Sequence, residues 1–112
     1  MSVKLNTRQV GDVSVIDVAG RITLGEGSSV LRDTLREMAG KGQKKILLNL
    51  GDVSYIDSSG IATFVEGLKG MMSYGGKMKF SNIPDKIVEI FSFSKLDKVF
   101  EIYGNRDDAV NS

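Results

Sequence analysis

Two adjacent serines in the middle of the chain are the clearest candidates for chemistry. The run Asp57-Ser58-Ser59-Gly60 follows the apolar stretch Ile46-Leu47-Leu48-Asn49-Leu50 and precedes a helical pattern, so it lies where a loop ends and a helix begins. The first N–H groups of a helix lack a partner inside the helix, and the helix dipole favours an anion there. A serine hydroxyl exposed at this point is well placed to carry a phosphate. Ser58 or Ser59 is therefore a candidate phosphorylation site.

The same serines have a simpler interpretation as the N-cap that starts the helix. From spacing alone this is the commoner role, because serine is one of the preferred N-cap residues. The two roles are compatible, since a capping hydroxyl can also be phosphorylated. A cap needs one residue, however, and Asp57-Ser58-Ser59 offers more polar groups than that. Capping alone therefore leaves Asp57 unexplained.

The composition argues against an enzyme. The chain has no histidine and no cysteine, so it lacks the commonest general base, the commonest metal ligand and any thiolate or disulfide. Ser58 as a nucleophile would need a positioned base. A serine–lysine pair stays open, although no lysine stands at a spacing that identifies it. We expect no catalytic residue, no metal site and no cofactor.

Charge balance and hydropathy limit the possible partners and location. With 15 basic and 14 acidic residues the net charge is +1, so we expect no broad basic surface for nucleic acid. No apolar run approaches the roughly 20 residues of a membrane span, and residues 1–6 have no apolar signal core. The sequence predicts a cytoplasmic protein with no membrane span and no direct contact with nucleic acid.

The order of the expected elements predicts an α/β fold. Apolar and β-branched runs predict strands, and apolar residues at helical spacing predict helices. Gly11-Asp12 marks a hairpin turn, and the loop 25–29 ends in serines typical of helix N-caps. The expected strands cover 3–10, 13–18, 46–50, 77–80 and 99–103; the expected helices follow residue 29, residue 59 and Pro84, with a short one over 106–110. This alternation indicates one domain over residues 1–112, with a mixed sheet and helices packed on it.

Asp57 also invites comparison with the phosphoacceptor of a response-regulator receiver. A receiver needs an acidic cluster after its first strand and a lysine after its last. This chain has Val18-Ala19-Gly20-Arg21 and Tyr103-Gly104 at those places, which disfavours a receiver. Asp52 and Asp57 are equally poor as a catalytic pair, because five residues apart across a strand-to-helix turn they are more typical of solvated loop acids.

The glycines before the first expected helix are more typical of a turn than of a nucleotide site. Gly25-Glu26-Gly27 would need a third glycine to complete a dinucleotide-binding fingerprint, and Val30 stands at that position. A flexible turn into a helix explains the segment better. We expect Gly25, Glu26 and Ser28 to form an edge that touches a partner.

A longer motif carries a resemblance to a known family. The segment from Asn49 to Ile61 resembles the signature of STAS domains, specifically the bacterial anti-sigma factor antagonists. The resemblance covers nearly the whole chain, with further landmarks at Gly20-Arg21-Ile22, Gly75-Gly76 and Ser94-Lys95-Leu96-Asp97. Asn49 stands where aspartate is frequent in the family, and Ala62 where glycine is common. Neither departure removes the serines.

The resemblance implies a fold and a switch. The fold is a single α/β domain of the STAS type, with a mixed four- to five-stranded sheet and about four helices, mainly against one face. In the switch, an anti-sigma factor that is also a GHKL-type serine kinase binds the dephosphorylated antagonist and releases a sigma factor. The kinase phosphorylates the first serine after the aspartate, here Ser58, and a PP2C-type phosphatase reverses this.

The resemblance also implies which residues meet the partner. The expected contact residues are Asp57, Ser58, Ser59 and Gly60, together with Gly25, Glu26 and Ser28, and the loop from Gly20 to Ser29 is expected to form part of the docking surface. Asp57 and Ser59 are expected to shape the site, and Gly60 to allow close approach. An alternative within the same family is a non-catalytic scaffold or regulatory subunit of a stressosome-like or membrane-transport complex.

Overall fold

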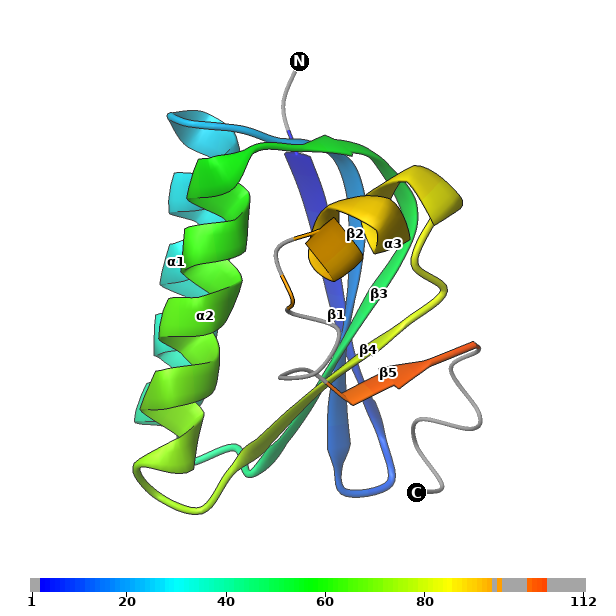
Figure 1. Cartoon of the computed structure of the whole chain (residues 1–112). Helices are drawn as coiled ribbons and strands as arrows, with labels where there is room; N and C mark the ends of the chain where they lie inside the picture. The colour runs from blue at the N-terminus through cyan, green and yellow to red at the C-terminus, as the bar shows by residue number, and fades with distance from the viewer. Residues whose placement is uncertain (1–2, 94, 96–100, 105–112) are drawn as a thin grey trace.

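The computed structural model describes residues 3–93, 95 and 101–104, which form one mixed sheet with helices packed on it (Figure 1). The strands are β1 (Val3–Val10), β2 (Val13–Ile22), β3 (Lys45–Ile56), β4 (Lys77–Ser81) and β5 (Glu101–Tyr103), and they lie side by side in chain order. β1 and β2 are antiparallel, joined by a turn at Gly11, whose φ of 62° suits a tight hairpin. Every later pair is parallel, so each later connection crosses from one end of the sheet to the other.

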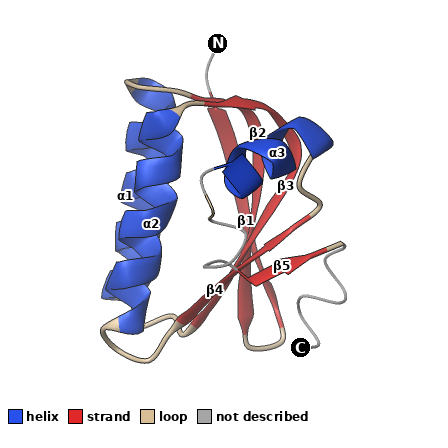
Figure 2. Ribbon diagram, in the orientation of Figure 1, coloured by secondary structure: helices blue, strands red, loops and turns tan. Residues whose placement is uncertain are grey.

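Three helices make these crossings and cover one face of the sheet. They are α1 (Glu26–Gly40), α2 (Ser58–Met72) and α3 (Asp85–Phe93). All three contribute buried residues to one apolar cluster with β2, β3 and β4. Figure 2 shows the helices in blue beside the red strands of the sheet. A second, smaller cluster on the opposite face contains Val13, Val15 and Leu47. The structure confirms the expected mixed α/β fold with its helices on one face.

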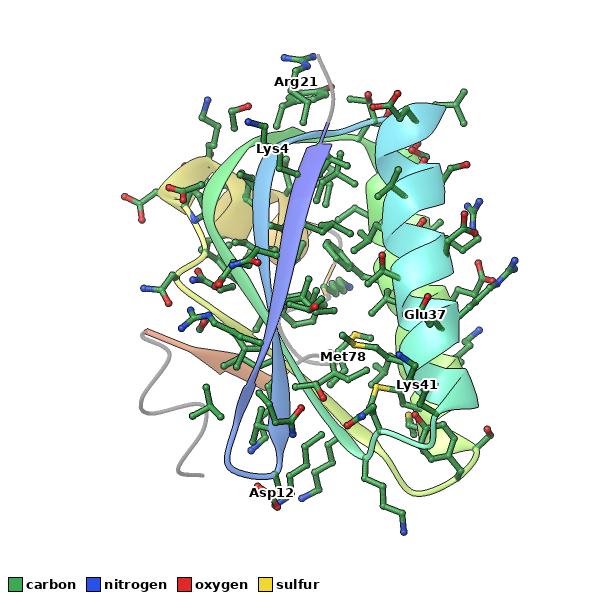
Figure 3. The ribbon with its side chains drawn as sticks, turned by 180° about the vertical axis from the view of Figure 1, so that it is seen from behind. Lys4, Asp12, Arg21, Glu37, Lys41 and Met78 are labelled. Carbon is green, nitrogen blue, oxygen red and sulfur yellow. The ribbon has the colours of Figure 1, made fainter. Side chains whose placement is uncertain are left out.

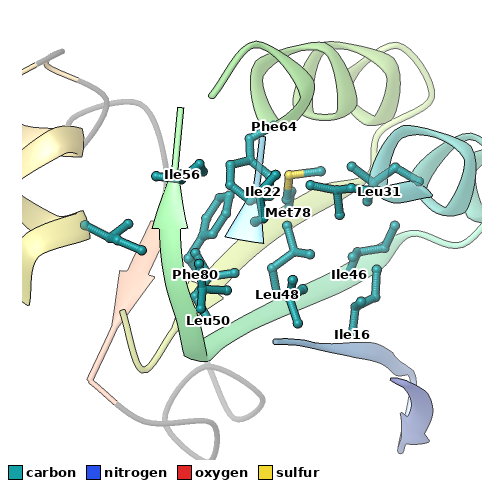
Figure 4. Packing of buried hydrophobic residues seen from close by; sticks show 14 of the residues in the cluster. Ile16, Ile22, Leu31, Ile46, Leu48, Leu50, Ile56, Phe64, Met78 and Phe80 are labelled. Atoms are coloured by element: carbon teal, nitrogen blue, oxygen red, sulfur yellow. The ribbon is translucent and has the colours of Figure 1, made fainter. Parts of the chain in front are cut away.

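Three phenylalanines hold α2 and α3 against the centre of the sheet. Phe64 of α2, Phe80 of β4 and Phe91 of α3 are fully buried and meet edge to face, with ring centroids 5.1, 5.7 and 6.4 Å apart. Aliphatic side chains from β2 and β3 lie beside Phe64 and Phe80 (Figure 4) and belong to the same cluster. Aromatic pairs in this geometry contribute about 0.5–1.5 kcal/mol each beyond the area that they bury. These contacts hold α2 against the sheet. The first residues of α2 lie at the end of β3.

β3 is longer than the sequence predicts. It continues to Ile56 instead of ending at Leu50, so the segment before the two serines extends the sheet and is not a loop. The extension pairs with the end of β2, which itself continues to Ile22, across two register shifts. Val53 and Ile56 are buried in the main cluster, which holds the extension against the helices. Asp57 consequently follows β3 directly and precedes α2 directly.

α1 also begins earlier than expected. The prediction that Ser28 and Ser29 cap this helix is wrong, because the helix starts at Glu26 with Gly25 at the N-cap position. Gly25 has φ 102° and ψ −129°, a conformation that side chains disfavour and glycine accepts. The backbone N–H groups of both serines already bond to carbonyls of Thr23 and Gly25, 3.0 Å away in each case. The two serines therefore lie in the first turn.

Two expectations concern the end of the chain. The last expected strand is present as Glu101–Tyr103, while residues 99 and 100 and the expected helix over 106–110 lie outside the described residues. Of the three helices that the structure describes, none combines the length and the apolar character needed to cross a bilayer.

Candidate functional site

Asp57 is the residue that caps α2. Its backbone is extended, with φ −107° and ψ −174°, and its Oδ1 accepts the backbone N–H groups of Ser59 at 2.9 Å and Gly60 at 3.2 Å. This satisfies two of the N–H groups that a helix start leaves without partners. The cap is thus the aspartate, and neither serine is needed for it. Asp57, which a serine cap would leave without a role, is therefore itself the cap.

The hydroxyl of Ser59 is already engaged inside the protein. It donates to Oδ1 of Asp57, and its oxygen lies 3.2 Å from the hydroxyl oxygen of Ser28. Ser28 is only 2% exposed, and its hydroxyl oxygen lies 3.1 Å from the carbonyl oxygen of Thr23. A serine hydroxyl has one hydrogen, and an ionised carboxylate only accepts. The Ser59 hydrogen therefore goes to Asp57, which leaves the Ser28 hydroxyl to donate to Thr23 or Ser59.

The second oxygen of Asp57 connects α2 to the loop between β2 and α1. Oδ2 accepts the backbone N–H of Leu24 at 2.9 Å, and the Asp57 N–H donates to the carbonyl of Ile22 at 3.1 Å. The Ser59 hydroxyl, and then the N–H groups of Leu24, Gly60 and Ser59, lower the pKa of Asp57 below its ordinary value against the opposing effect of burial. Asp57 therefore stays ionised near neutral pH and serves as a fixed structural acceptor.

Ser58 differs from its neighbours because its side chain is exposed and uncommitted. It is the first residue of α2, directly after the cap. In the described part of the chain, no group forms a hydrogen bond with its hydroxyl. The geometry therefore favours Ser58 over Ser59 as the hydroxyl that an external enzyme reaches, at a helix N-terminus where an added anion is tolerated.

Gly60 has a packing role inside the protein, in addition to the partner contact expected from the sequence. The residue is buried, and a Cβ added to it would lie 2.6 Å from Cγ1 of Ile56 and 2.8 Å from Cγ2 of Ile22. Only glycine lets the first turn of α2 rest so closely on the ends of β2 and β3. Gly60 thus places Ser58.

The β2–α1 loop lies beside the start of α2, as Figure 1 shows at the top left. Of the loop residues singled out from the sequence, Gly25 and Glu26 are exposed at this end, whereas Ser28 is buried beneath them. Leu24 lies in the same expected docking loop, was not singled out from the sequence, and is 83% exposed. The signal that the sequence offers for its exposure is the presence of a large apolar residue next to a Gly-Glu-Gly turn.

Two further groups complete this end of the sheet. The guanidinium of Arg21 lies 4.7 Å from the centre of the Tyr55 ring, and both residues are exposed (Arg21 is labelled in Figure 3). Asp52 of β3 pairs with Ala19 of β2. Asp57 instead donates its N–H to Ile22, which lies about 10 Å farther along β2. Asp52 and Asp57 are therefore no catalytic pair. Within the ranges described, no three acidic side chains gather as a metal site requires.

The model of the STAS domain family matches residues 4–109. This chain belongs to the STAS domain family. It is similar to the anti-sigma-B factor antagonist of Bacillus subtilis, with 27% identity over 110 residues that cover 98% of this chain and 99% of that protein.

Solved structures share the fold of this STAS domain. An anti-sigma factor antagonist from Mycobacterium paratuberculosis superimposes with a TM-score of 0.88 at 18% identity, covering 97% of this chain and 92% of that one. The Bacillus cell fate determinant SpoIIAA in its phosphorylated form superimposes with a TM-score of 0.76 at 18% identity, covering 96% and 97%. At identities this low, the structural similarity establishes the fold alone, and the function has to be argued from the site.

Proposed function

We propose that this STAS domain protein is an anti-sigma factor antagonist that is switched off by phosphorylation of Ser58. The observation that carries the proposal is the contrast between the two serines, since the Ser59 hydroxyl is bonded within the protein and the Ser58 hydroxyl is exposed. Similarity over the full length to an anti-sigma-B factor antagonist supports the same function. The partner is an anti-sigma factor that is itself a GHKL-type serine kinase, and a PP2C-type phosphatase restores the active form.

In this proposal the protein supplies the acceptor and the kinase supplies the catalysis. A bond forms between Oγ of Ser58 and the γ-phosphorus of ATP, the bond to the leaving ADP breaks, and the hydroxyl proton passes to a base of the kinase. Asp57 is no substitute for that base, because both of its oxygens already accept hydrogen bonds and its pKa is lowered. The antagonist therefore acts as a binding protein with no catalytic residue of its own.

The phosphate changes binding more than folding. A phosphoserine carries about −1.5 to −2 charges at pH 7. At the N-terminus of α2 the helix dipole favours that charge, while the adjacent Asp57 carboxylate opposes it, so the net effect on the fold is small. At a docked surface the same charge must lose its water. An unpaired buried charge costs several kcal/mol, and each 1.4 kcal/mol weakens binding tenfold.

The test is phosphorylation in vitro by the GHKL-type kinases of the same organism, with the phosphate located by fragment mass spectrometry. We expect one phosphate on Ser58, no transfer to Ser58→Ala, and continued transfer to the matched control Ser59→Ala. We also expect Ser58→Ala to bind the kinase in the presence of ATP and Ser58→Asp to bind weakly. Transfer to Ser59, or equal binding of the two Ser58 variants, contradicts the proposal. Stable binding to scaffold or transporter subunits without phosphate turnover would favour the alternative role.

A further inference from the structure

Leu24 is an unusual residue to find in water beside a phosphoacceptor. The residue is 83% exposed and lies in the loop between β2 and α1. Single exposed apolar residues are common on protein surfaces and need no explanation by themselves. Leu24 stands out because its own backbone N–H is bonded to Asp57, the residue immediately before Ser58.

The backbone around Leu24 is held on both sides. The preceding carbonyl, of Thr23, accepts the backbone N–H of Ser28 at 3.0 Å, and the hydroxyl of Ser28 lies 3.1 Å from it. The following carbonyl, of Gly25, accepts the N–H of Ser29 at 3.0 Å. With its own N–H bonded to Asp57 at 2.9 Å, the backbone of Leu24 is held in place. A contact residue that is fixed before binding loses less conformational entropy when the complex forms.

Some of the exposed residues around Leu24 are small. Gly25 follows Leu24 directly, and Ser58 follows Asp57, which accepts the N–H of Leu24. Ala62 is exposed one helical turn after Ser58, so the two residues share one face of α2. A partner can therefore approach the backbone closely on either side of the leucine.

We propose that Leu24 is the apolar anchor of the kinase-binding surface, and that the partner kinase receives it in an apolar recess next to the position of Ser58. This inference rests on the proposed function, and it adds a binding residue that is not phosphorylated. The contact surface, named here the Leu24 surface, consists of Leu24, Gly25, Glu26, Ser58 and Ala62.

The position of the anchor explains why a phosphate on Ser58 prevents binding. Enclosing Leu24 in an apolar recess removes water from the neighbouring Ser58 as well. An unmodified hydroxyl tolerates this at small cost, whereas a phosphate dianion does not. Glu26 on this surface and Asp57 beside Ser58 are both carboxylates, and they repel the phosphate. The Leu24 anchor and the phosphate on Ser58 thus affect the same part of the kinase contact.

The experiment compares Leu24→Ala with the matched control Met72→Ala. Met72 is also largely exposed, at 64%, but lies at the opposite end of α2. The titrated partner is the GHKL-type kinase that phosphorylates the wild-type protein. We expect Leu24→Ala to raise the Kd about tenfold or more, Leu24→Met to restore most of the affinity, and Met72→Ala to have no effect. Because both side chains are exposed, all unfolding midpoints should stay unchanged.

A kinetic measurement separates an anchor from a general disturbance of the site. Leu24→Ala leaves the hydroxyl of Ser58 in place, so it should raise the KM for the antagonist and leave kcat unchanged. Wild-type-like KM and Kd for Leu24→Ala would overturn the anchor while the proposed function stands. If no kinase binds or phosphorylates the wild-type protein, the proposed function and the anchor both fall. The two failures are therefore distinguishable.

Discussion

Replacing Asp57 by asparagine separates the two structural roles of this side chain. Oδ1 accepts the hydroxyl and N–H of Ser59 and the N–H of Gly60, whereas Oδ2 accepts the N–H of Leu24. Asparagine offers one oxygen and one NH₂ group. Because three donors meet Oδ1 and one meets Oδ2, the amide oxygen will occupy the Oδ1 position. The NH₂ group will then face the N–H of Leu24, and that bond will be lost.

The expected loss of stability follows from this count. Asparagine is as good an N-cap as aspartate, so the cap is retained. A hydrogen bond to a charged group contributes about 1.5–3 kcal/mol, and water partly replaces this one because it lies at the surface. We expect Asp57→Asn to lower the free energy of unfolding by about 1–2 kcal/mol. Asp57→Ala should lose a further 0.5–2 kcal/mol or so, because it removes the cap as well.

Urea unfolding and amide hydrogen exchange followed by NMR test this division. In Asp57→Asn the Leu24 amide should exchange about tenfold faster, while the Ser59 and Gly60 amides keep their protection. In Asp57→Ala all three amides should lose protection. Equal protection of Leu24 in the wild type and in Asp57→Asn would refute the reasoning, because it would show that Oδ2 does not hold the loop.

Two further predictions follow from the same end of α2. The pKa of Asp57 is depressed in the folded state, so its stabilisation is complete above its unfolded pKa of about 3.9 and is lost as the pH falls through the folded value. The stability difference between wild type and Asp57→Asn should therefore shrink below about pH 4, and an NMR titration that gives Asp57 an ordinary or raised pKa would contradict this. Gly60→Ala should cost about 1–3 kcal/mol through contact with Ile22 and Ile56. Its control in the same helix, Gly70→Ala, meets nothing within 4 Å and should be neutral or stabilising in the same urea titration.

The position of the site could be predicted from the sequence, but the division of roles within it could not. Local patterns placed the start of a helix at Asp57-Ser58-Ser59, and α2 begins there. Aspartate and serine are almost equally good caps, so propensity does not say which of them accepts the first N–H groups. That choice depends on β3, whose extension to Ile56 puts Asp57 at the cap position. The extension is held by pairing with β2, which a local pattern does not contain.

Contacts between distant segments explain the remaining differences. Gly60 in the sequence looks like a residue that gives a partner access, and only the structure shows that glycine is also needed there because Ile22, from another strand, lies against it. Ser28 looks like a helix cap, yet it is buried because α1 begins at Glu26, two residues earlier. Leu24 looks like any loop residue until the bond from its N–H to Asp57 shows that it is fixed beside Ser58. Each of these roles is set by tertiary structure.

The central claim is that one phosphate on Ser58 abolishes binding to the partner kinase without changing the fold. Isothermal titration of that kinase with the unmodified protein and with the protein phosphorylated on Ser58 tests it most directly. We expect the phosphate to raise the Kd by about a hundredfold or more, from the several kcal/mol cost of burying an unpaired charge, with an unchanged unfolding midpoint. Equal Kd values for the two forms would contradict the account.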